Sequence, residues 1–171
     1  MEDTFQKLEM VFKKLDRRIE LLNAERAQDG GMRISRAEIK ILGQMSLLLN
    51  RTVSTEISLA ETGDLDAFLV TEYAVIREMR ALLAEVGFVY DDLSAEIWLP
   101  AGARFEPLFQ FTNVVVTRLD PESALTSKAI KAPKKNRMLI QDALASHAFS
   151  GLAERIEKNG GNLSYFLEVG K

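Results

Sequence analysis

The sequence predicts an α+β domain: a mixed sheet of four or five strands flanked by helices, with a helical N-terminal extension and a helical C-terminal third. Two observations support this prediction. Short apolar runs bounded by glycine or polar loops, such as "GDLDAFLV", lie in the middle of the chain. Longer segments with apolar residues three or four positions apart lie before, between and after them, as expected for amphipathic helices.

Composition sets the broad class of protein. With 171 residues and a hydrophobic fraction of 47%, the chain is long and apolar enough to bury a sizeable core. A net charge of −3 argues against broad nucleic-acid affinity. The absence of cysteine excludes disulfides and thiolate metal sites. No run of about 18 apolar residues and no signal-peptide core is seen, so we expect a cytoplasmic protein without a membrane span.

The first segment is predicted to be a helix with a continuous apolar stripe. The stripe residues recur at spacings of three and four: Phe5, Leu8, Phe12, Leu15, Ile19 and Leu22. Such a stripe suits either a dimer or partner seam, or packing of the helix on its own domain. The stripe stops at Asn23, and Gly30 and Gly31 break the segment. We therefore divide the chain into an N-terminal amphipathic helix, 1–30, and a main domain, 31–171.

Two structures are compatible with "ISRAEIKILGQMSLLLNR", which follows. Ser35 and Glu38 have the spacing of a capping box, which would start a single helix ending near Asn50. Alternatively, "EIKIL" is a short strand, Gly43 forms a turn, and "QMSLLLNR" is a short helix. The wider pattern favours strand, glycine turn and helix. Residues 51–61 are polar and rich in Ser and Thr, and are predicted to be a loop.

The stretch "GDLDAFLV" is predicted to be a strand that opens at Gly63. Residues two apart in a strand point to the same face, so Asp64 and Asp66 should lie side by side, about 7 Å apart. Leu65 and Ala67 then face the opposite side of the sheet. Two negative charges on one face of a partly buried strand indicate a site for a cation, a basic side chain or a helix terminus.

The remaining elements follow from their patterns. "TEYAVIREMRALLAEVGF" is predicted to be a helix that stops at Gly87. Three strands are then expected in "AEIWLP", "RFEPLFQF" and "NVVVTRL", the second of them an edge or bulged strand because it contains Pro107. Asp120 caps a helix over residues 121–131 with Pro121 at its first position. "KKNRMLIQDALAS" and "FSGLAERIEKN" complete the helical C-terminal third.

The order of these elements resembles the nucleotidyltransferase superfamily, which shares the polymerase β fold. Its core motif is a glycine turn followed by Asp-x-Asp on the next strand, matched here by Gly43 with Gln44 and by Asp64 with Asp66. The later stretch "TRLDPESALTSK" resembles a segment of bacterial nucleotidyltransferase-like proteins related to AbiEii-type toxins. The positions that match it are Leu119, Pro121, Glu122, Leu125 and Lys128.

The resemblance implies a magnesium-dependent enzyme that transfers NMP from an NTP to an acceptor. It assigns catalytic and metal-binding roles to Asp64 and Asp66, because Mg²⁺ is held by one or two carboxylates together with substrate phosphates. Gly43, Gln44 and Lys128 would contact the nucleotide. A third carboxylate usually activates the acceptor, and Glu106 is the first candidate for it. Glu96 is the second candidate for that role.

Three departures from the family pattern leave a second function open. Gln44 replaces a small residue in the turn, the loop before Asp64 is long, and Asn136 stands where related chains often carry aspartate. A catalytically inactive member would act as a protein-binding module, for example in a toxin–antitoxin pair. The N-terminal stripe would suit such a partner or a homodimer.

Overall fold

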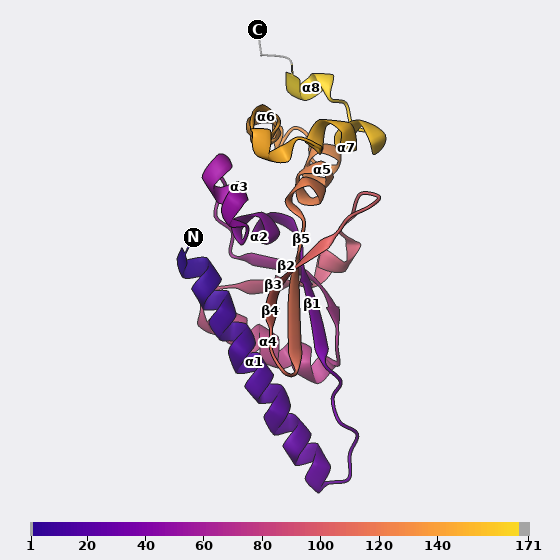
Figure 1. Ribbon diagram of the computed structural model, residues 1–171. Coiled ribbons are helices and arrows are strands. Elements are labelled where there is room, and N and C mark those ends of the chain that lie inside the picture. The colour runs from indigo at the N-terminus through magenta and orange to yellow at the C-terminus, as the bar shows by residue number, and fades with distance from the viewer. Residues whose placement is uncertain (1, 168–171) are drawn as a thin grey trace.

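The computed structural model, which describes residues 2–167, is an α+β fold built on a five-stranded mixed sheet (Figure 1). The strand order across the sheet is β3-β2-β1-β5-β4. The strands are β1 (Ala37–Ile41), β2 (Asp64–Val70), β3 (Val89–Asp91), β4 (Phe105–Gln110) and β5 (Val114–Leu119). The predicted fold class and the mixed sheet are therefore confirmed.

Parallel and antiparallel neighbours alternate across this sheet. β1 is antiparallel to β2 and parallel to β5. β2 is parallel to the short strand β3, and β4 is antiparallel to β5. The register between β4 and β5 shifts between Pro107 and Phe109, at the edge of the sheet. Pro107 has no N–H to donate to a ladder, which explains the irregularity predicted for this strand.

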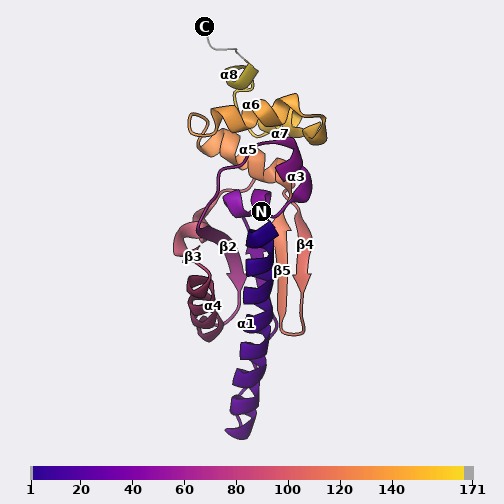
Figure 2. The ribbon, with the colours of Figure 1, turned by 90° about the vertical axis from the view of Figure 1, so that its left-hand side faces the viewer.

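Two helices, α1 (Glu2–Gln28) and α4 (Tyr73–Glu85), cover one face of the sheet (Figures 1 and 2). The stripe of α1 lies in the core of its own chain: Leu8, Phe12, Leu15 and Ile19 are 0% exposed. Burying such a side chain contributes about 1.5–3 kcal/mol. The stripe predicted as either a dimer seam or an intramolecular contact is thus an intramolecular contact. The helix also continues past Asn23 and ends at Gln28.

The segment after α1 forms a strand, a glycine turn and a helix. β1 ends at Ile41, and Gly43 begins the short helix α2 (Gly43–Leu48) with a φ of +58°. The prediction of strand, turn and helix over a single helix is confirmed. A second short helix, α3 (Arg51–Glu56), follows it.

The prediction of a loop over residues 51–61 was wrong for its first half, where α3 lies. Asn50 caps α3, because its side chain accepts hydrogen bonds from the N–H groups of Thr52 and Val53. Val53 is 0% exposed and anchors the helix in the core. A good cap and one buried side chain therefore outweigh the low helix propensity of Ser and Thr.

The predicted strand "AEIWLP" is also not formed. Its first residues end the 3₁₀ helix η1 (Asp92–Glu96), and residues 97–100 are irregular. Ser94, which is fully buried, donates a hydrogen bond to the carbonyl of Ala67 on β2. This bond directs the chain away from the sheet. The strand that pairs with β2 on the side away from β1 is instead β3, which precedes η1 and was not predicted.

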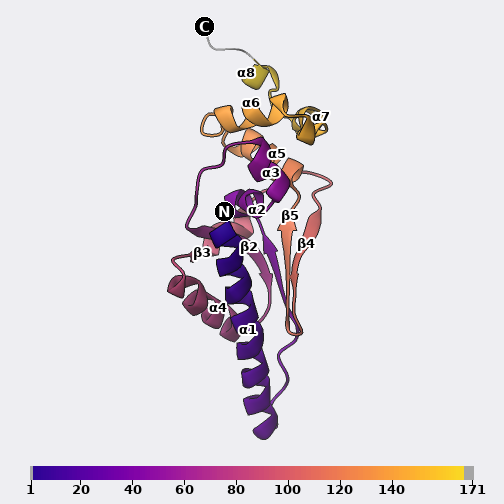
Figure 3. The same ribbon diagram turned by 60° about the vertical axis from the view of Figure 1, so that its left-hand side comes forward.

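The C-terminal helices gather at one end of the sheet, beyond β5 (Figures 1 and 3). They are α5 (Pro121–Lys131), α6 (Arg137–Ala145), η2 (His147–Phe149), α7 (Leu152–Lys158) and α8 (Ser164–Leu167). They share a second core that includes Leu119, Leu125 and Ile140. α5 packs against α2 and α7.

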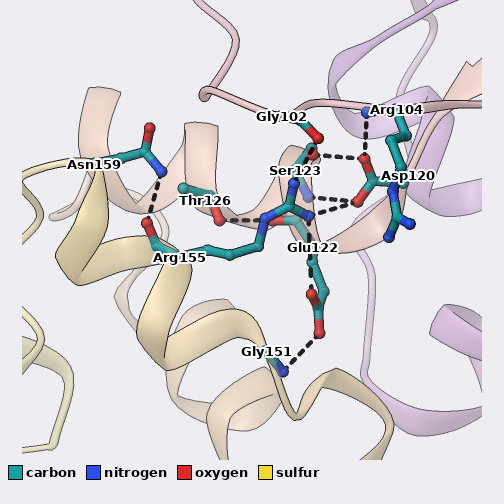
Figure 4. Close-up of polar contacts among 9 residues, drawn as sticks. All are labelled: Gly102, Arg104, Asp120, Glu122, Ser123, Thr126, Gly151, Arg155 and Asn159. Atoms are coloured by element: carbon teal, nitrogen blue, oxygen red, sulfur yellow. Dashed lines mark hydrogen bonds and ion pairs between the residues drawn. The ribbon is translucent and has the colours of Figure 1, made fainter.

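A buried polar network fixes the start of α5 (Figure 4). The carboxylate of Asp120 accepts hydrogen bonds from the N–H and hydroxyl of Ser123 and from the N–H of Arg104. It also pairs with Arg155 of α7 at 2.9 Å. The neighbouring Glu122 accepts from the N–H of Gly151 at 2.9 Å. The Asp-Pro-Glu segment thus joins β5, α5 and α7 and has a structural role here.

None of the helices within residues 2–167 combines the length and the apolar character that a membrane crossing requires.

Candidate functional site

The two aspartates of β2 lie on the face of the sheet opposite α1 and α4. Burial alternates along β2, with Leu65 and Ala67 at 0% exposed in the core against α1 and α4. Side chains alternate between the two faces along a strand, so Asp64 and Asp66 point to the other face of the sheet. Asp64 is exposed at the start of the strand, whereas Asp66 is half-buried.

Neither carboxylate of this pair has a hydrogen-bond or ion-pair partner among the described residues. Asp64 and Asp66 make polar contacts through their backbones: Asp64 donates its N–H to the hydroxyl of Thr62, and Asp66 accepts from the N–H of Leu42 through its carbonyl. Asp120, by contrast, receives several hydrogen bonds and a guanidinium. A half-buried carboxylate without a partner is costly, so Asp66 is not explained by stabilisation of the fold.

Asp91 brings a third carboxylate to the pair. It is the residue of β3 in register with Asp66 of β2, and paired residues of parallel strands point to the same face. Its carboxylate also caps η1 by accepting from the N–H of Leu93 at 2.9 Å. Sequence reasoning missed Asp91 because β3 has only three residues. The available signal was "GFVYDD", where an apolar run follows a glycine and ends on acids, close to β2 in the chain.

These charges act on the titration of Asp66. Burial raises the pKa of Asp66 above its ordinary value, and the negative charges of Asp91 and Asp64 raise it further. The positive charge of Lys128 partly offsets them. Asp66 therefore carries its charge at a cost that a bound cation would remove.

Gly43 lies directly against the carboxylate of Asp66. A Cβ atom on Gly43 would stand 2.2 Å from Oδ2 of Asp66, well inside van der Waals contact. The φ of +58° at Gly43 is also a conformation that L side chains rarely adopt. The backbone N–H of the adjacent Leu42 donates to the carbonyl of Asp66 at 2.8 Å. Both the turn and the packing of the carboxylate thus require glycine at this position.

Lys128 of α5 supplies positive charge to the same region. Burial lowers the pKa of Lys128 below its ordinary value, the charge of Lys135 lowers it further, and the charge of Asp66 opposes both. Lys128 forms no direct ion pair with a described residue. Lys128 and Lys135 thus place positive charge near Asp66. No described acid lies within ion-pair distance of Lys128.

A cavity of about 480 Å³ opens between α2, α5, α6 and the loop that precedes β2. Its lining includes Gln44, Thr62, Lys128, Lys135 and Asn136. The side chain of Gln44 turns to the loop and donates to the carbonyl of Ala60 at 2.8 Å. Gln44 therefore forms a wall of the cavity, and its amide is tied to the protein. The cavity has the size of a small-molecule pocket.

The structure does not bring Glu106 or Glu96 to the aspartate pair. Glu106 lies on β4, which β1 and β5 separate from β2. Its carboxylate accepts from Nε and Nη2 of Arg118 at 3.3 and 3.2 Å. Glu96 is exposed at the end of η1 and is not among the charges that shift the pKa of Asp66. The acid in register with Asp66 is Asp91.

Magnesium fits this donor set, although the described residues contain no group of three or more His, Cys, Asp or Glu that could hold a metal together. Mg²⁺ prefers carboxylate oxygens and commonly takes only one or two of them, with phosphate and water completing its octahedron. Asp64 and Asp66 offer carboxylates without other partners. The donor chemistry therefore suits a cation that arrives with a phosphate ligand.

Comparison of the chain with protein-family models, with curated proteins and with solved structures gives no match.

Proposed function

We propose that the protein is a magnesium-dependent nucleotidyltransferase that transfers NMP from an NTP to an acceptor hydroxyl. The observation that carries this proposal is the pair of carboxylates, Asp64 and Asp66, which have no hydrogen-bond or ion-pair partner within residues 2–167. They stand beside Asp91 and against the glycine turn at Gly43. The resemblance of these elements to the nucleotidyltransferase motif supports the same function.

The nucleotide would bind in the 480 Å³ cavity beside these residues. Lys128 and Lys135 both line the cavity and would offset the negative charge of the triphosphate. The absence of a side chain at Gly43 leaves room for the carboxylate of Asp66 at the turn. Mg²⁺, held by Asp64 and Asp66, would polarise the phosphoryl oxygens and stabilise charge on the leaving group.

The reaction exchanges one phosphorus–oxygen bond for another. The acceptor oxygen forms a bond to the α-phosphorus, and the bond from that phosphorus to the oxygen bridging the β-phosphate breaks. Pyrophosphate leaves with the electron pair of that bond. The proton of the acceptor hydroxyl passes to a carboxylate, and we assign this base role to Asp91, because it is the acid that the fold places next to the pair.

The test is transfer of labelled NMP. The protein is incubated with Mg²⁺ and each of the four α-³²P-labelled NTPs, together with a small-molecule extract and total RNA and protein of a bacterial lysate as acceptors. We expect one class of product to gain label in the presence of Mg²⁺. Asp66→Asn should abolish labelling, whereas Asp29→Asn, the same change at an exposed residue after α1 that does not line the cavity, should retain it.

A nucleotide-binding member without transfer activity is the second candidate. It is favoured by the Gln44 side chain, which stands where the family pattern has a small residue. It predicts that NTP binds but that no acceptor gains label. The apolar stripe of α1 is buried in the chain's own core, so it gives no support to a protein-binding module.

A further inference from the structure

Thr62 stands both in the wall of the proposed nucleotide cavity and next to the aspartate pair. It lines the 480 Å³ cavity together with Lys128 and Lys135. Its hydroxyl oxygen accepts a hydrogen bond from the backbone N–H of Asp64 at 3.1 Å. Thr62 therefore connects the wall of the cavity directly to the first residue of β2, which is one of the two proposed magnesium ligands.

The loop that carries Thr62 is held on both sides of this residue. The side chain of Gln44 donates to the carbonyl of Ala60 at 2.8 Å. The carbonyl of Gly63 accepts from the N–H of Val89 at 2.9 Å, which ties the end of the loop to β3. Thr62 lies between these two bonds, so its position relative to the aspartates is fixed. A small residue at position 44 could not make the first bond, and the departure of Gln44 from the family pattern thus has a positioning role.

The hydroxyl of Thr62 is available for chemistry. It acts as the acceptor in its bond with Asp64, and no described residue receives its proton. The other hydroxyl in the lining belongs to Ser58, which stands six residues before Asp64, on the far side of the bond between Gln44 and Ala60. Thr62 is therefore the lining hydroxyl that the fold places beside the aspartates.

We propose that Thr62 is itself an acceptor, so that the protein transfers one NMP group to its own chain. The inference rests on the proposed function, because the same magnesium–nucleotide site would perform the transfer. A hydroxyl that is already held beside the site reacts within the molecule and avoids the entropic cost of binding a separate acceptor. The attached NMP would stay in the cavity, so each chain should be modified no more than once.

The step balances as follows. Oγ1 of Thr62 forms a bond to the α-phosphorus, and the bond from that phosphorus to the oxygen bridging the β-phosphate breaks. Pyrophosphate leaves with the electron pair of that bond, and Thr62 is left as a phosphodiester. The proton of the hydroxyl passes to the exposed carboxylate of Asp64 and from there to solvent. Asp64 takes this role for Thr62 because Asp91 lies in register with Asp66, farther from the loop.

The experiment is intact-mass spectrometry of the denatured full chain after incubation with Mg²⁺ and each of the four NTPs, without an added acceptor. We expect a gain of one NMP mass with at least one NTP and no gain without Mg²⁺. Peptide mapping of the wild type should place the group on Thr62. Because the reaction occurs within one molecule, the fraction modified per unit time should not depend on protein concentration. The modification should also resist mild acid, unlike a phosphoramidate on Lys128 or Lys135.

Variants at position 62 test the hydroxyl itself. Thr62→Val keeps the shape of the side chain and should lose the modification, whereas Thr62→Ser should keep it. Thr52→Val is the matched control, because Thr52 is exposed on α3 and does not line the cavity, and it should be modified as the wild type is. Peptide mapping of the wild type decides the question if Thr62→Val does not fold. A label on another residue, an acid-labile label, a rate that rises with protein concentration, or full labelling of Thr62→Val would overturn the inference.

Binding of a non-hydrolysable NTP analogue, measured by calorimetry, provides a readout that does not depend on turnover. The unmodified chain should bind the analogue with Mg²⁺, and the modified chain should not, because its cavity already holds an NMP group. Undiminished binding by the modified chain would place the group outside the cavity and contradict the inference.

The outcomes also separate this inference from the proposed function. If an added acceptor gains label but the protein does not, the proposed function stands and Thr62 is not an acceptor. If the analogue binds but neither the protein nor any added acceptor gains label, transfer activity fails and the inference fails with it.

Discussion

Replacing Asp66 by asparagine should stabilise the metal-free protein. Asp64 lies about 7 Å away along the strand and Asp91 about 4.8 Å away across it, from standard strand geometry. At the dielectric constant of water, these two repulsions amount to about 0.6 and 0.9 kcal/mol, and they are larger at a half-buried site. The attraction of Lys128 offsets part of this sum. Asn keeps the shape, removes the charge and so should raise the free energy of unfolding by about 1 kcal/mol.

Thermal and urea unfolding at pH 7 without divalent cations measure this change. For a chain of 171 residues, about 1 kcal/mol corresponds to a rise in Tm of about 2–4 °C. The matched control is Asp120→Asn, the same chemical change at a carboxylate with a full set of partners. It should lower the free energy of unfolding by about 3 kcal/mol, because it removes the charge of a buried carboxylate that accepts three hydrogen bonds and leaves Arg155 only the more distant Glu122, at 3.8 Å.

A loss of stability in Asp66→Asn would refute this reasoning. A decrease of about 1–3 kcal/mol would show that the carboxylate of Asp66 accepts a hydrogen bond that holds the fold. The unpartnered carboxylate, on which the proposed function rests, would then not exist in solution.

Three further predictions test the surroundings of the site. Gly43→Ala should lower the free energy of unfolding by about 1–2 kcal/mol because of the positive φ at this position. The new Cβ also meets the carboxylate of Asp66, which adds to the cost. Asp66→Ala should relieve this added cost in a double-mutant cycle measured by urea unfolding. Burial tends to raise the pKa of Asp120, but hydrogen bonds and Arg155 hold it below its ordinary value of 3.8. The stabilisation from Asp120 should therefore be present above about pH 4 and disappear as pH falls through the lowered pKa, so the stability gap to Asp120→Asn should narrow in acid; an unchanged gap would contradict this. Phe12→Ala should cost about 3–5 kcal/mol in urea unfolding while the particle mass from light scattering stays the same; a change in mass would indicate that the stripe also forms an interface.

Much of the fold could be predicted where one local signal dominates. β2 was recognisable because a glycine opens it and apolar and polar residues alternate along it, and this alternation also placed Asp64 and Asp66 on one face. The Asp120 cap and Pro121 likewise located the start of α5. These features depend on residues within one or two turns of each other, so the sequence displays them directly.

Other features depend on contacts that the sequence does not display. α3 exists because of the Asn50 cap and the burial of Val53, although its residues favour a loop. The apolar run around Ile97 looks like a strand, but the hydrogen bond from Ser94 to β2 turns the chain before it. In each case a tertiary contact outweighs local propensity.

The third carboxylate shows the same limit at the candidate site. Glu106 was chosen as an acid on a strand expected to lie next to the pair, but the strand order places two strands between it and the pair. Asp91 lies in a strand of three residues, too short to show a period of two, and its proximity to Asp66 follows only from the pairing of β3 with β2. Which acids meet is decided by strand order, which no local pattern reveals.

Calorimetric titration of the protein with non-hydrolysable analogues of each of the four NTPs, with and without Mg²⁺, tests the proposed nucleotide site most directly. We expect binding that requires Mg²⁺ in the wild type, that is lost in Asp66→Asn, and that is weakened in Lys128→Met, because these residues supply opposite charges to the same site. Thr52→Trp should bind as the wild type does. Absence of binding for all four nucleotide analogues in the presence of Mg²⁺, or equal binding by wild type and Asp66→Asn, would contradict a magnesium–nucleotide site at the aspartate pair.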